Sequence, residues 1–239
     1  MSGSLSDALV RTCEIAFARP APPAGFVHRL VGGAASIDDA AGFFRAEYTS
    51  SLIFREALGP RLLETSAGHR ARAAAWPVLY RELGSGAMER SSPFLLRKLL
   101  VALGADDDRL DWTVDRADPA VQEELAVVAE LDGIGLLARA LGAACRARGY
   151  PALARLLADR LLVPEPALAY FALRGEDGVT SCTQLVAVLD VVADTPAQAE
   201  AALAALTAYL DEDRPRQLCS AALAVDRNGD LSVPDQAAL

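Results

Sequence analysis

Prolines and glycines divide this chain into short segments, and most of these segments begin with a signal for the start of a helix. The clearest signal is Thr195-Pro-Ala-Gln198, where a threonine cap precedes a proline at the first helical position and a glutamine follows three residues after the cap. These two side chains can satisfy two amides of the first turn reciprocally, as a capping box. We therefore predict a long helix that begins at Pro196 and bends at Pro215, before Val225.

Weaker signals of the same kind predict the other helices. They are expected at residues 5–18, at 36–58 up to a break or kink at Gly59-Pro60, at 61–83 with a kink at Pro77, and at 94–103. Further helices are expected at 119–148, with Asp118 as the cap and a division near Gly133 and Gly135, and from 150 to a point before Pro164. Between residues 166 and 192 we expect an interruption, because Gly175 and Gly178 both have low helix propensity. The longest predicted loop is 105–117, with Trp112 as its anchor.

The composition agrees with helices rather than strands. Hydrophobic residues make up 52% of the 239 residues but aromatic residues only 6%, so that most apolar side chains are Ala, Leu and Val. Small and unbranched side chains suit closely packed helices. The fold class is therefore predicted to be all-α, a single bundle of seven or eight helices.

Domain boundaries follow from the breaks in the helical pattern. Residues 1–35 are expected to form an N-terminal helical arm and a Pro-rich linker, because the prolines of Arg19-Pro-Ala-Pro-Pro-Ala-Gly exclude helix. Residues 36–225 are expected to form the helical domain, and residues 226–239 a C-terminal tail.

The tail contains a short motif that resembles a calcium loop. Asp226, Asn228 and Asp230 provide oxygen side chains at the first, third and fifth positions. Leu231 replaces the glycine that the loop needs, and Ala237 replaces the bidentate glutamate. We therefore interpret the motif as an ordinary turn.

Charge and hydropathy exclude several classes of partner. The formal net charge is −9, whereas nucleic acid and anionic membranes require clustered positive charge. The N-terminus lacks the basic and apolar pattern of a signal peptide, and no apolar run reaches the roughly 18 residues of a membrane span. We therefore expect a cytoplasmic protein that binds neither nucleic acid nor membrane, and whose partner is a small molecule or another protein, a homodimer included.

The usual metal and nucleotide motifs are absent from the sequence. Four cysteines lie far apart without a CxxC pair, and we interpret them as buried free thiols. Neither His28 nor His69 has a second ligand three or four residues away on a helix. There is no phosphate-binding loop and no nucleophile elbow. We expect no metal and no cofactor.

Three segments carry a resemblance to a known superfamily. The first begins at Glu82-Leu-Gly and continues to Ser92-Pro93, the second ends with Cys145-Arg-Ala-Arg-Gly-Tyr-Pro151, and the third runs from Tyr170-Phe171 to Ser181. Their order and spacing, between about Ser36 and Ala224, resemble the heme-oxygenase-like superfamily, in particular its iron-containing oxidases and the TenA and PqqC proteins. The resemblance implies a heme-oxygenase-like helical bundle with a cavity between its central helices.

The chain departs from that family at the positions of the metal ligands. Ser92, Arg174, Gly178 and Ser181 stand where the family's oxidases have ligands, and only Glu82 remains. Arginine and glycine side chains do not bind iron, and one carboxylate cannot hold two irons. A diiron oxidase would need replacement ligands, for which the candidates are Glu47, Glu176 and Asp177.

The resemblance therefore implies a metal-independent site, as in TenA and PqqC. The candidate catalytic residues are Glu82, Tyr170, Arg174 and Cys182, and the candidate substrate-binding residues are Glu82, Arg174 and Ser181. An inward-facing Arg174 must have a carboxylate or an anionic ligand as partner, because an unpaired buried charge is costly. Tyr170 is a candidate proton donor and Cys182 a candidate nucleophile.

The function expected from this site is that of a metal-independent enzyme or ligand-binding protein for a small organic molecule, in specialised metabolism by analogy. Two alternatives stay open. One is a non-catalytic homologue that serves as a partner or scaffold protein, and the other is a diiron oxidase with atypical ligands. A scaffold is expected to fill the cavity with side chains, whereas an enzyme is expected to keep a largely apolar pocket with a few convergent polar groups.

Overall fold

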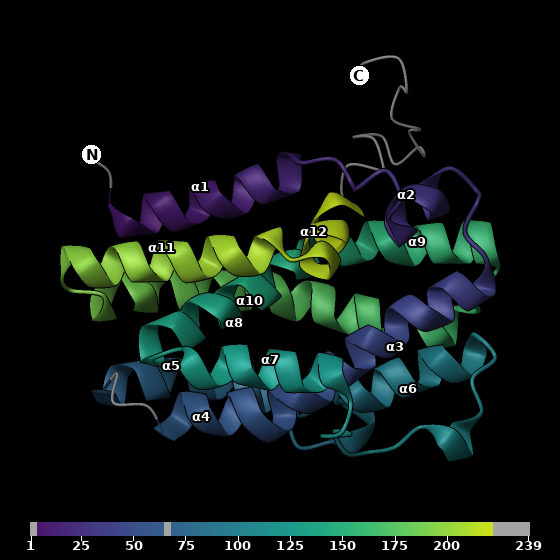
Figure 1. Ribbon diagram of the computed structural model, residues 1–239, viewed down its shortest axis with the longest axis horizontal. Coiled ribbons are helices and arrows are strands. Elements are labelled where there is room, and N and C mark those ends of the chain that lie inside the picture. Colours follow the sequence, from purple (N-terminus) through teal and green to yellow (C-terminus); the bar gives the residue numbers. More distant parts are fainter. Residues whose placement is uncertain (1–3, 65–67, 222–239) are drawn as a thin grey trace.

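The computed structural model describes residues 4–64 and 68–221, and these contain helices but no β-strand, which confirms the all-α prediction (Figure 1). The α-helices are α1 (Leu5–Ala18), α2 (Phe26–Val31), α3 (Ile37–Ile53), α4 (Gly59–Glu64), α5 (Gly68–Glu82), α6 (Ser92–Ala102), α7 (Pro119–Glu130), α8 (Gly133–Arg146), α9 (Tyr150–Leu161), α10 (Ala169–Val192), α11 (Pro196–Asp211) and α12 (Asp213–Ser220). A π-helical turn, Phe54–Leu58, joins α3 to α4, and short 3-10 turns lie at Met88–Arg90, Asp107–Arg109, Ala147–Gly149 and Glu165–Leu168.

The number of helices exceeds the predicted seven or eight. The difference arises from short helices such as α2, α4 and α12, which have only 6, 6 and 8 residues and are too short to show a full apolar period. None of the described helices is both long and apolar enough to cross a membrane. The predicted tail, 226–239, with the Asp226–Asp230 motif, lies outside the described residues.

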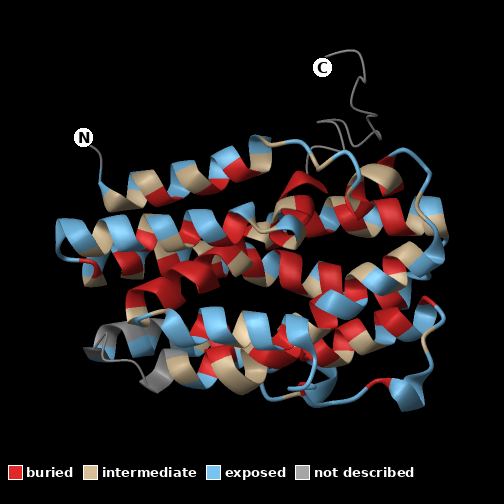
Figure 2. Cartoon of the chain, viewed as in Figure 1, coloured by how far each residue is buried: buried red, intermediate tan, exposed pale blue. Residues whose placement is uncertain are grey.

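Helices α8 and α10 lie in the middle of the bundle (Figure 1). Helices α1 and α11 cover them on one side, and α3 to α7 lie on the other. Buried residues concentrate on the helix faces that point toward this centre, while the outer faces are exposed (Figure 2). They form two apolar clusters, one around Phe44 and Phe171 and the other around Leu137 and Leu141.

The N-terminal helix packs on this bundle. The bounds of α1 are those predicted, and its cap is the Ser4 hydroxyl, which accepts a hydrogen bond from the Asp7 amide. Leu9, Cys13 and Ala16 of α1 are buried, and the helix contacts α10, α11 and α12. Helix α2 lies in the segment predicted as linker. The boundary at residue 35 stays a prediction.

The chain does not leave the helix at Gly59-Pro60. The Gly59 amide donates to the Phe54 carbonyl, five residues back, and the helix continues as α4. A proline has no amide hydrogen and its ring crowds the preceding turn. A wider π-helical turn just before Pro60 accommodates both effects, so that the predicted break is a local change of helical register.

The predicted interruption at Gly175 and Gly178 is wrong, because α10 runs through both glycines without a break. Gly178 instead lies where α10 comes very close to the end of α8. A Cβ atom there would be 2.4 Å from the Cβ of Ala147 and 2.9 Å from the carbonyl oxygen of Ala144. The glycine is thus explained by the close approach of two helices, which the sequence alone does not show.

The C-terminal prediction is half right. Helix α11 begins at Pro196 with the expected capping box between Thr195 and Gln198, but it ends at Asp211. The predicted bend at Pro215 is wrong, because a separate helix, α12, begins at Asp213 and holds this proline in its first turn. Proline fits there, since the first-turn amides of a helix have no internal acceptor.

The two glycines of α10 provide a test of this packing. Gly178→Ala should lower the free energy of unfolding by about 1–3 kcal/mol, because the new methyl group overlaps Ala147. Gly175→Ala is the matched control. Its Cβ would lie 3.6 Å from Pro151, an ordinary contact, and the gain in helix propensity should stabilise the protein by up to about 1 kcal/mol. Urea unfolding measures both, and equal effects of the two substitutions would contradict the close approach.

Candidate functional site

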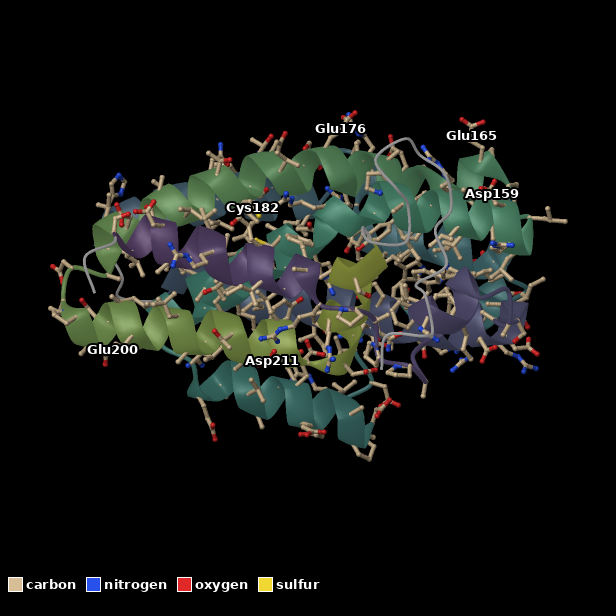
Figure 3. The ribbon with its side chains drawn as sticks, turned by 90° about the horizontal axis from the view of Figure 1, so that it is seen from above. Asp159, Glu165, Glu176, Cys182, Glu200 and Asp211 are labelled. Carbon is tan, nitrogen blue, oxygen red and sulfur yellow. The ribbon has the colours of Figure 1, made fainter. Side chains whose placement is uncertain are left out.

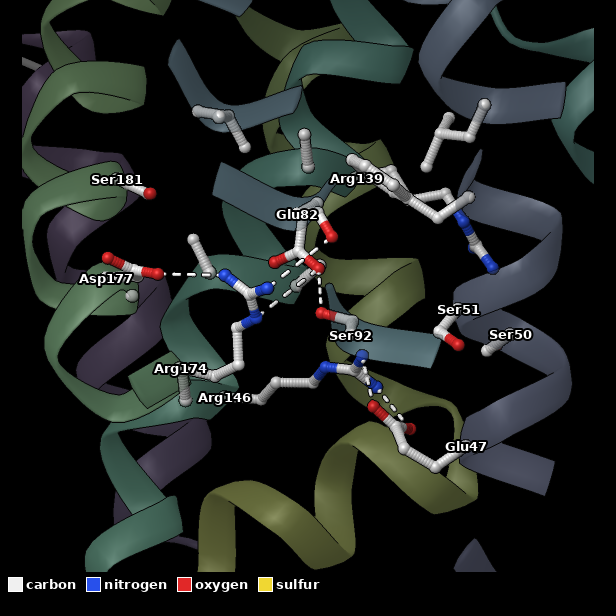
Figure 4. A pocket seen from close by; sticks show the side chains of 18 of the residues that line it. Glu47, Ser50, Ser51, Glu82, Ser92, Arg139, Arg146, Arg174, Asp177 and Ser181 are labelled. Atoms are coloured by element: carbon white, nitrogen blue, oxygen red, sulfur yellow. Dashed lines mark hydrogen bonds and ion pairs between the residues drawn. The ribbon is translucent and has the colours of Figure 1, made fainter. Parts of the chain in front are cut away.

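A cavity lies between α3, α5, α8 and α10, lined by residues of both apolar clusters (Figure 4). Its volume is about 70 Å³, enough for roughly five water molecules or a small ligand. The charged side chains in its wall are Glu47, Arg81, Glu82, Glu124, Arg139, Arg146, Arg174 and Asp177. Its apolar wall includes Ile53, Phe54, Leu58, Val78 and Val128. The cavity is therefore neither filled with side chains nor uniformly apolar.

Glu47 is the most deeply buried of these charges, with 1% of its side chain exposed. Arg146 holds it through both terminal nitrogens of its guanidinium: Nη2 lies 2.6 Å from Oε1, and Nη1 donates to Oε2 over 2.9 Å. From α12, Nε of Arg214 lies 3.3 Å from Oε2. Burial acts to lower the pKa of Arg146, but the Glu47 carboxylate and neighbouring tyrosines outweigh it, so that this pKa is raised and the guanidinium stays charged.

Two buried tyrosines complete the surroundings of Glu47. The Tyr170 hydroxyl donates to Oε1 over 3.1 Å, and it lies 3.1 Å from the hydroxyl of Tyr150. Burial raises the pKa of Tyr170 well above its usual value, and the negative charge of Glu47 adds to the effect. The predicted proton donor thus directs its proton at a buried carboxylate of the protein itself.

Arg174 is buried and has the partners that an inward-facing arginine was predicted to need. Its side chain is 3% exposed, and Nη1 donates to Asp177 Oδ2 over 2.8 Å. Nη2 donates to the Arg90 carbonyl over 2.7 Å, and Nε lies 3.9 Å from Glu82 Oε2. The same Glu82 oxygen accepts a hydrogen bond from the Ser92 hydroxyl (Figure 4). Arg174 therefore joins α10 to the end of α5 and the start of α6.

A second buried arginine, Arg139 of α8, closes another wall. It lies 3.1 Å from Glu124 and 2.7 Å from Glu212, and its guanidinium stacks 4.7 Å from the centre of the Tyr209 ring. Burial raises the pKa of Tyr209 to about 12, against the opposing effect of Arg146 and Arg139. The charge of Arg139 is thus also balanced by carboxylates of the protein itself.

Arg81 differs from the other arginines of the cavity. Its Nη2 donates to two neutral oxygens, Ser181 Oγ over 2.8 Å and Gln184 Oε1 over 2.9 Å. Its Nε is shielded from solvent and has no hydrogen-bond partner among the described residues, which is also true of Nε in Arg146 and Arg174. In the part of the chain that the structure describes, Arg81 is also the only arginine of the cavity wall without a carboxylate partner. Its charge is therefore available to an anion.

The structure brings most of the predicted site residues together. Glu82, Tyr170, Arg174 and Ser181 all line the cavity. Cys182 does not belong to the lining, and its sulfur lies between the helices, 2.9 Å from that of Cys145 (Figure 3). A helix places successive residues about 100° apart, so that Ser181 and its neighbour point in different directions.

The candidate replacement ligands for iron do not converge. Glu47 is shared by two arginines, Asp177 is paired with Arg174, and Glu176 points outward from α10 (Figure 3). Within residues 4–64 and 68–221, no three His, Cys, Asp or Glu side chains are placed so that they could hold a metal.

Sequence reasoning missed the arginines of the site other than Arg174. Arg139 and Arg146 of α8 carried a usable signal, because they lie seven residues apart, two helical turns, in an otherwise Ala, Leu and Gly-rich segment. Two charged residues at that spacing lie on the same face of the helix. On an otherwise apolar helix this indicates that both side chains are buried and paired with other residues. Arg81 carried no comparable signal, since it adjoins Glu82 near the predicted end of a helix, before Gly84.

No protein-family model matches this chain, and no curated protein matches it either.

The pairing of Glu47 can be tested by removing its charge. Glu47→Ala should lower the free energy of unfolding by about 3–5 kcal/mol, because it leaves the mostly buried Arg146 and the partly buried Arg214 without their shared counter-charge. Glu56→Ala, which breaks the more exposed pair with Arg55, should cost no more than about 1 kcal/mol. Chemical unfolding of both variants measures the difference, and a loss at Glu47 as small as that at Glu56 would refute a buried network.

The raised pKa of Tyr209 predicts a loss of stability in alkali. Between pH about 10 and 12 the tyrosine loses its proton in the unfolded chain but keeps it in the fold, so that stability falls as pH rises through this window. Tyr209→Phe should make the fall shallower by roughly 1 kcal/mol per pH unit. Unfolding curves from pH 9 to 12 measure the slope, with Tyr80→Phe, an exposed tyrosine, as control. An unchanged slope in Tyr209→Phe would contradict the assignment.

Proposed function

We propose that the central cavity binds a small organic molecule with a carboxylate at one end, and that Arg81 holds this carboxylate. The observation that carries the proposal is the charge state of the cavity wall. Arg146, Arg174 and Arg139 each have a carboxylate partner, whereas the partners of Arg81 among the described residues are the neutral oxygens of Ser181 and Gln184. A half-buried guanidinium without a counter-charge is relieved by an anionic ligand.

The apolar wall defines the other end of the ligand. Leu58, Val78 and Val128 line the cavity together with Ile53 and Phe54. A hydrocarbon chain or ring in contact with them gains about 25 cal/mol for each Å² of apolar surface removed from water. The cavity volume of about 70 Å³ restricts the ligand to a small molecule. Short aliphatic or single-ring carboxylic acids fit these limits.

Carboxylate recognition by arginine has a specific geometry. A planar guanidinium offers parallel N–H groups that match the two oxygens of a carboxylate, and such charge-assisted hydrogen bonds are among the strongest in proteins. The Nε of Arg81 has no hydrogen-bond partner in the part of the chain that the structure describes, and Nη2 is held by Ser181 and Gln184. Ser181 therefore acts on the ligand indirectly, by fixing the arginine.

Glu82 is the residue of the cavity best suited to exchange a proton with the ligand. Its side chain is 34% exposed. Its Oε2 atom accepts a hydrogen bond from the Ser92 hydroxyl and lies 3.9 Å from Nε of Arg174. Tyr170 is less suited, because its hydroxyl hydrogen bonds to Glu47 and its pKa is raised. A reaction catalysed here would be a proton transfer to or from the bound acid without a metal, with Glu82 as general acid or base.

We also propose that the chain is a member of the heme-oxygenase-like superfamily that has lost the metal ligands. The support is the convergence of the three segments that carry the resemblance. Ser92, Arg174, Gly178 and Ser181, which stand at the ligand positions of the family's oxidases, all line the same cavity as Glu82. The convergence of these positions at one cavity is what the resemblance implies, and it supports the proposal.

The scaffold alternative is less well supported. It predicts a cavity filled with side chains, whereas this chain keeps an open space with charged groups in its wall. The cavity is nevertheless smaller and more polar than a typical drug-sized pocket. We therefore favour a small, charged ligand over a large apolar one.

Binding of simple carboxylates tests the proposal directly. Hexanoate, benzoate and phenylacetate are titrated calorimetrically into the full chain, and at least one should bind, while the corresponding amides should not. Arg81→Gln should weaken that binding about 10- to 100-fold, the loss expected for a charge-assisted hydrogen bond. Arg72→Gln, an exposed arginine on the same helix, should leave the affinity unchanged.

The result that would overturn the proposal is equal binding of acids and amides, or unchanged affinity in Arg81→Gln. Unfolding curves of both arginine variants establish that each is folded, so that a loss of binding can be assigned to the site.

A further inference from the structure

Three of the four cysteines meet inside the bundle, although they are far apart in the sequence. The sulfur of Cys13 on α1 lies 2.7 Å from that of Cys145 on α8, and Cys145 lies 2.9 Å from Cys182 on α10. The Cys13 and Cys145 positions are 132 residues apart, and Cys145 and Cys182 are 37 apart. Cys145 is therefore the shared neighbour of two thiols, on two different helices.

The three thiols differ in their access to solvent. Cys13 is 4% exposed and Cys145 is 3% exposed, whereas Cys182 is only partly buried. A reagent from solution therefore reaches Cys182 first. The fourth cysteine, Cys219 of α12, is fully buried and makes no sulfur contact with the cluster among the described residues.

The thiols also differ in acidity. A hydrogen bond from Cys145 lowers the pKa of Cys13, and the positive charge of Arg148 contributes in the same direction against burial. Hydrogen bonds to Cys13 and Cys182, together with burial, raise the pKa of Cys145. A thiolate is the attacking species in disulfide exchange, so that Cys13 is the better nucleophile of the two buried thiols.

We propose that these cysteines form a thiol relay, in which an oxidising disulfide reacts at Cys182 and the resulting bond passes through Cys145 to Cys13. The oxidant is a small disulfide of the glutathione type. In the first step the Cys182 thiolate attacks this disulfide, forms a mixed disulfide and releases one glutathione thiol. In the second, Cys145 passes its proton to the Cys13 sulfur 2.7 Å away and attacks the Cys182 sulfur. The other glutathione leaves as a thiolate and takes up this proton from Cys13.

In the last step Cys13 attacks Cys145, a Cys13–Cys145 disulfide forms, and Cys182 leaves as a thiol. Two protein thiols have then lost two electrons and two protons, and one glutathione disulfide has become two thiols. Cys182 returns to its starting state, so that it acts as the entry point and not as part of the product.

The product would fix the N-terminal helix to the centre of the bundle. Without it, α1 is held by the packing of Leu9 and Ala16 and by a hydrogen bond from the Ser6 amide to Asp190. A covalent bond between α1 and α8 closes a loop of 132 residues and restricts the unfolded chain. Oxidation would therefore suppress local opening of α1, while the carboxylate-binding cavity, which none of these cysteines lines, stays unchanged.

The experiment follows the thiols of the full chain over time. The reduced protein is treated with oxidised glutathione, samples are quenched with acid and an alkylating agent, and disulfides are located by mass spectrometry of non-reduced peptides. We expect a glutathione adduct on Cys182, then a Cys145–Cys182 bond, and finally accumulation of Cys13–Cys145. Hydrogen exchange of the α1 amides should become slower in the oxidised product.

Three variants separate the steps. Cys182→Ser should slow formation of Cys13–Cys145 about 10-fold or more, because the reagent must then reach a buried thiol. Cys13→Ala should stop the sequence at Cys145–Cys182. Cys219→Ala should oxidise at the wild-type rate. Urea unfolding of the reduced variants verifies their folding.

Two results would overturn the relay. One is formation of Cys13–Cys145 at the wild-type rate in Cys182→Ser, and the other is a wild-type protein that keeps the glutathione adduct without forming an internal disulfide.

Discussion

The carboxylate of Glu47 is the charge on which the arrangement of the central helices depends. A carboxylate with 1% of its surface exposed is tolerated only if its oxygens are paired and hydrogen-bonded. Arg146 of α8, Arg214 of α12 and Tyr170 of α10 provide these partners, and all must be in place at once. Since the acid itself belongs to α3, a single buried charge constrains four helices.

The same pairing explains the character of the cavity. In a helical bundle with a large apolar pocket, the ligand would occupy the central space. Here paired charged side chains form much of the cavity wall instead. Arg174 with Asp177 and Arg139 with Glu124 repeat the arrangement of Glu47 and Arg146. What stays open is small, and Arg81 is the arginine of its wall for which no carboxylate partner lies among the described residues. This is the basis of the small organic acid that we propose as the ligand.

Local signals in the sequence predicted helix ends well and helix interiors less well. The Thr195 capping box and the start of α9 at Tyr150-Pro151 were correct, because a cap acts within a few residues of chain. Gly178 was interpreted as a break because glycine has low helix propensity. The propensity cost is about 1 kcal/mol, and close packing of α10 on Ala147 outweighs it.

The sequence by itself determined that the chain is helical and where most helices start. These properties depend on periodicity and on short motifs, which are local. Only the tertiary structure decided that Glu47 meets Arg146, 99 positions away, and that Cys13 meets Cys145, 132 positions away. Helical periodicity defines which face of a helix is buried, but it does not define which helix that face will meet. Partners of buried charges and thiols are fixed only when all faces are packed together, because each pair must then be satisfied without water.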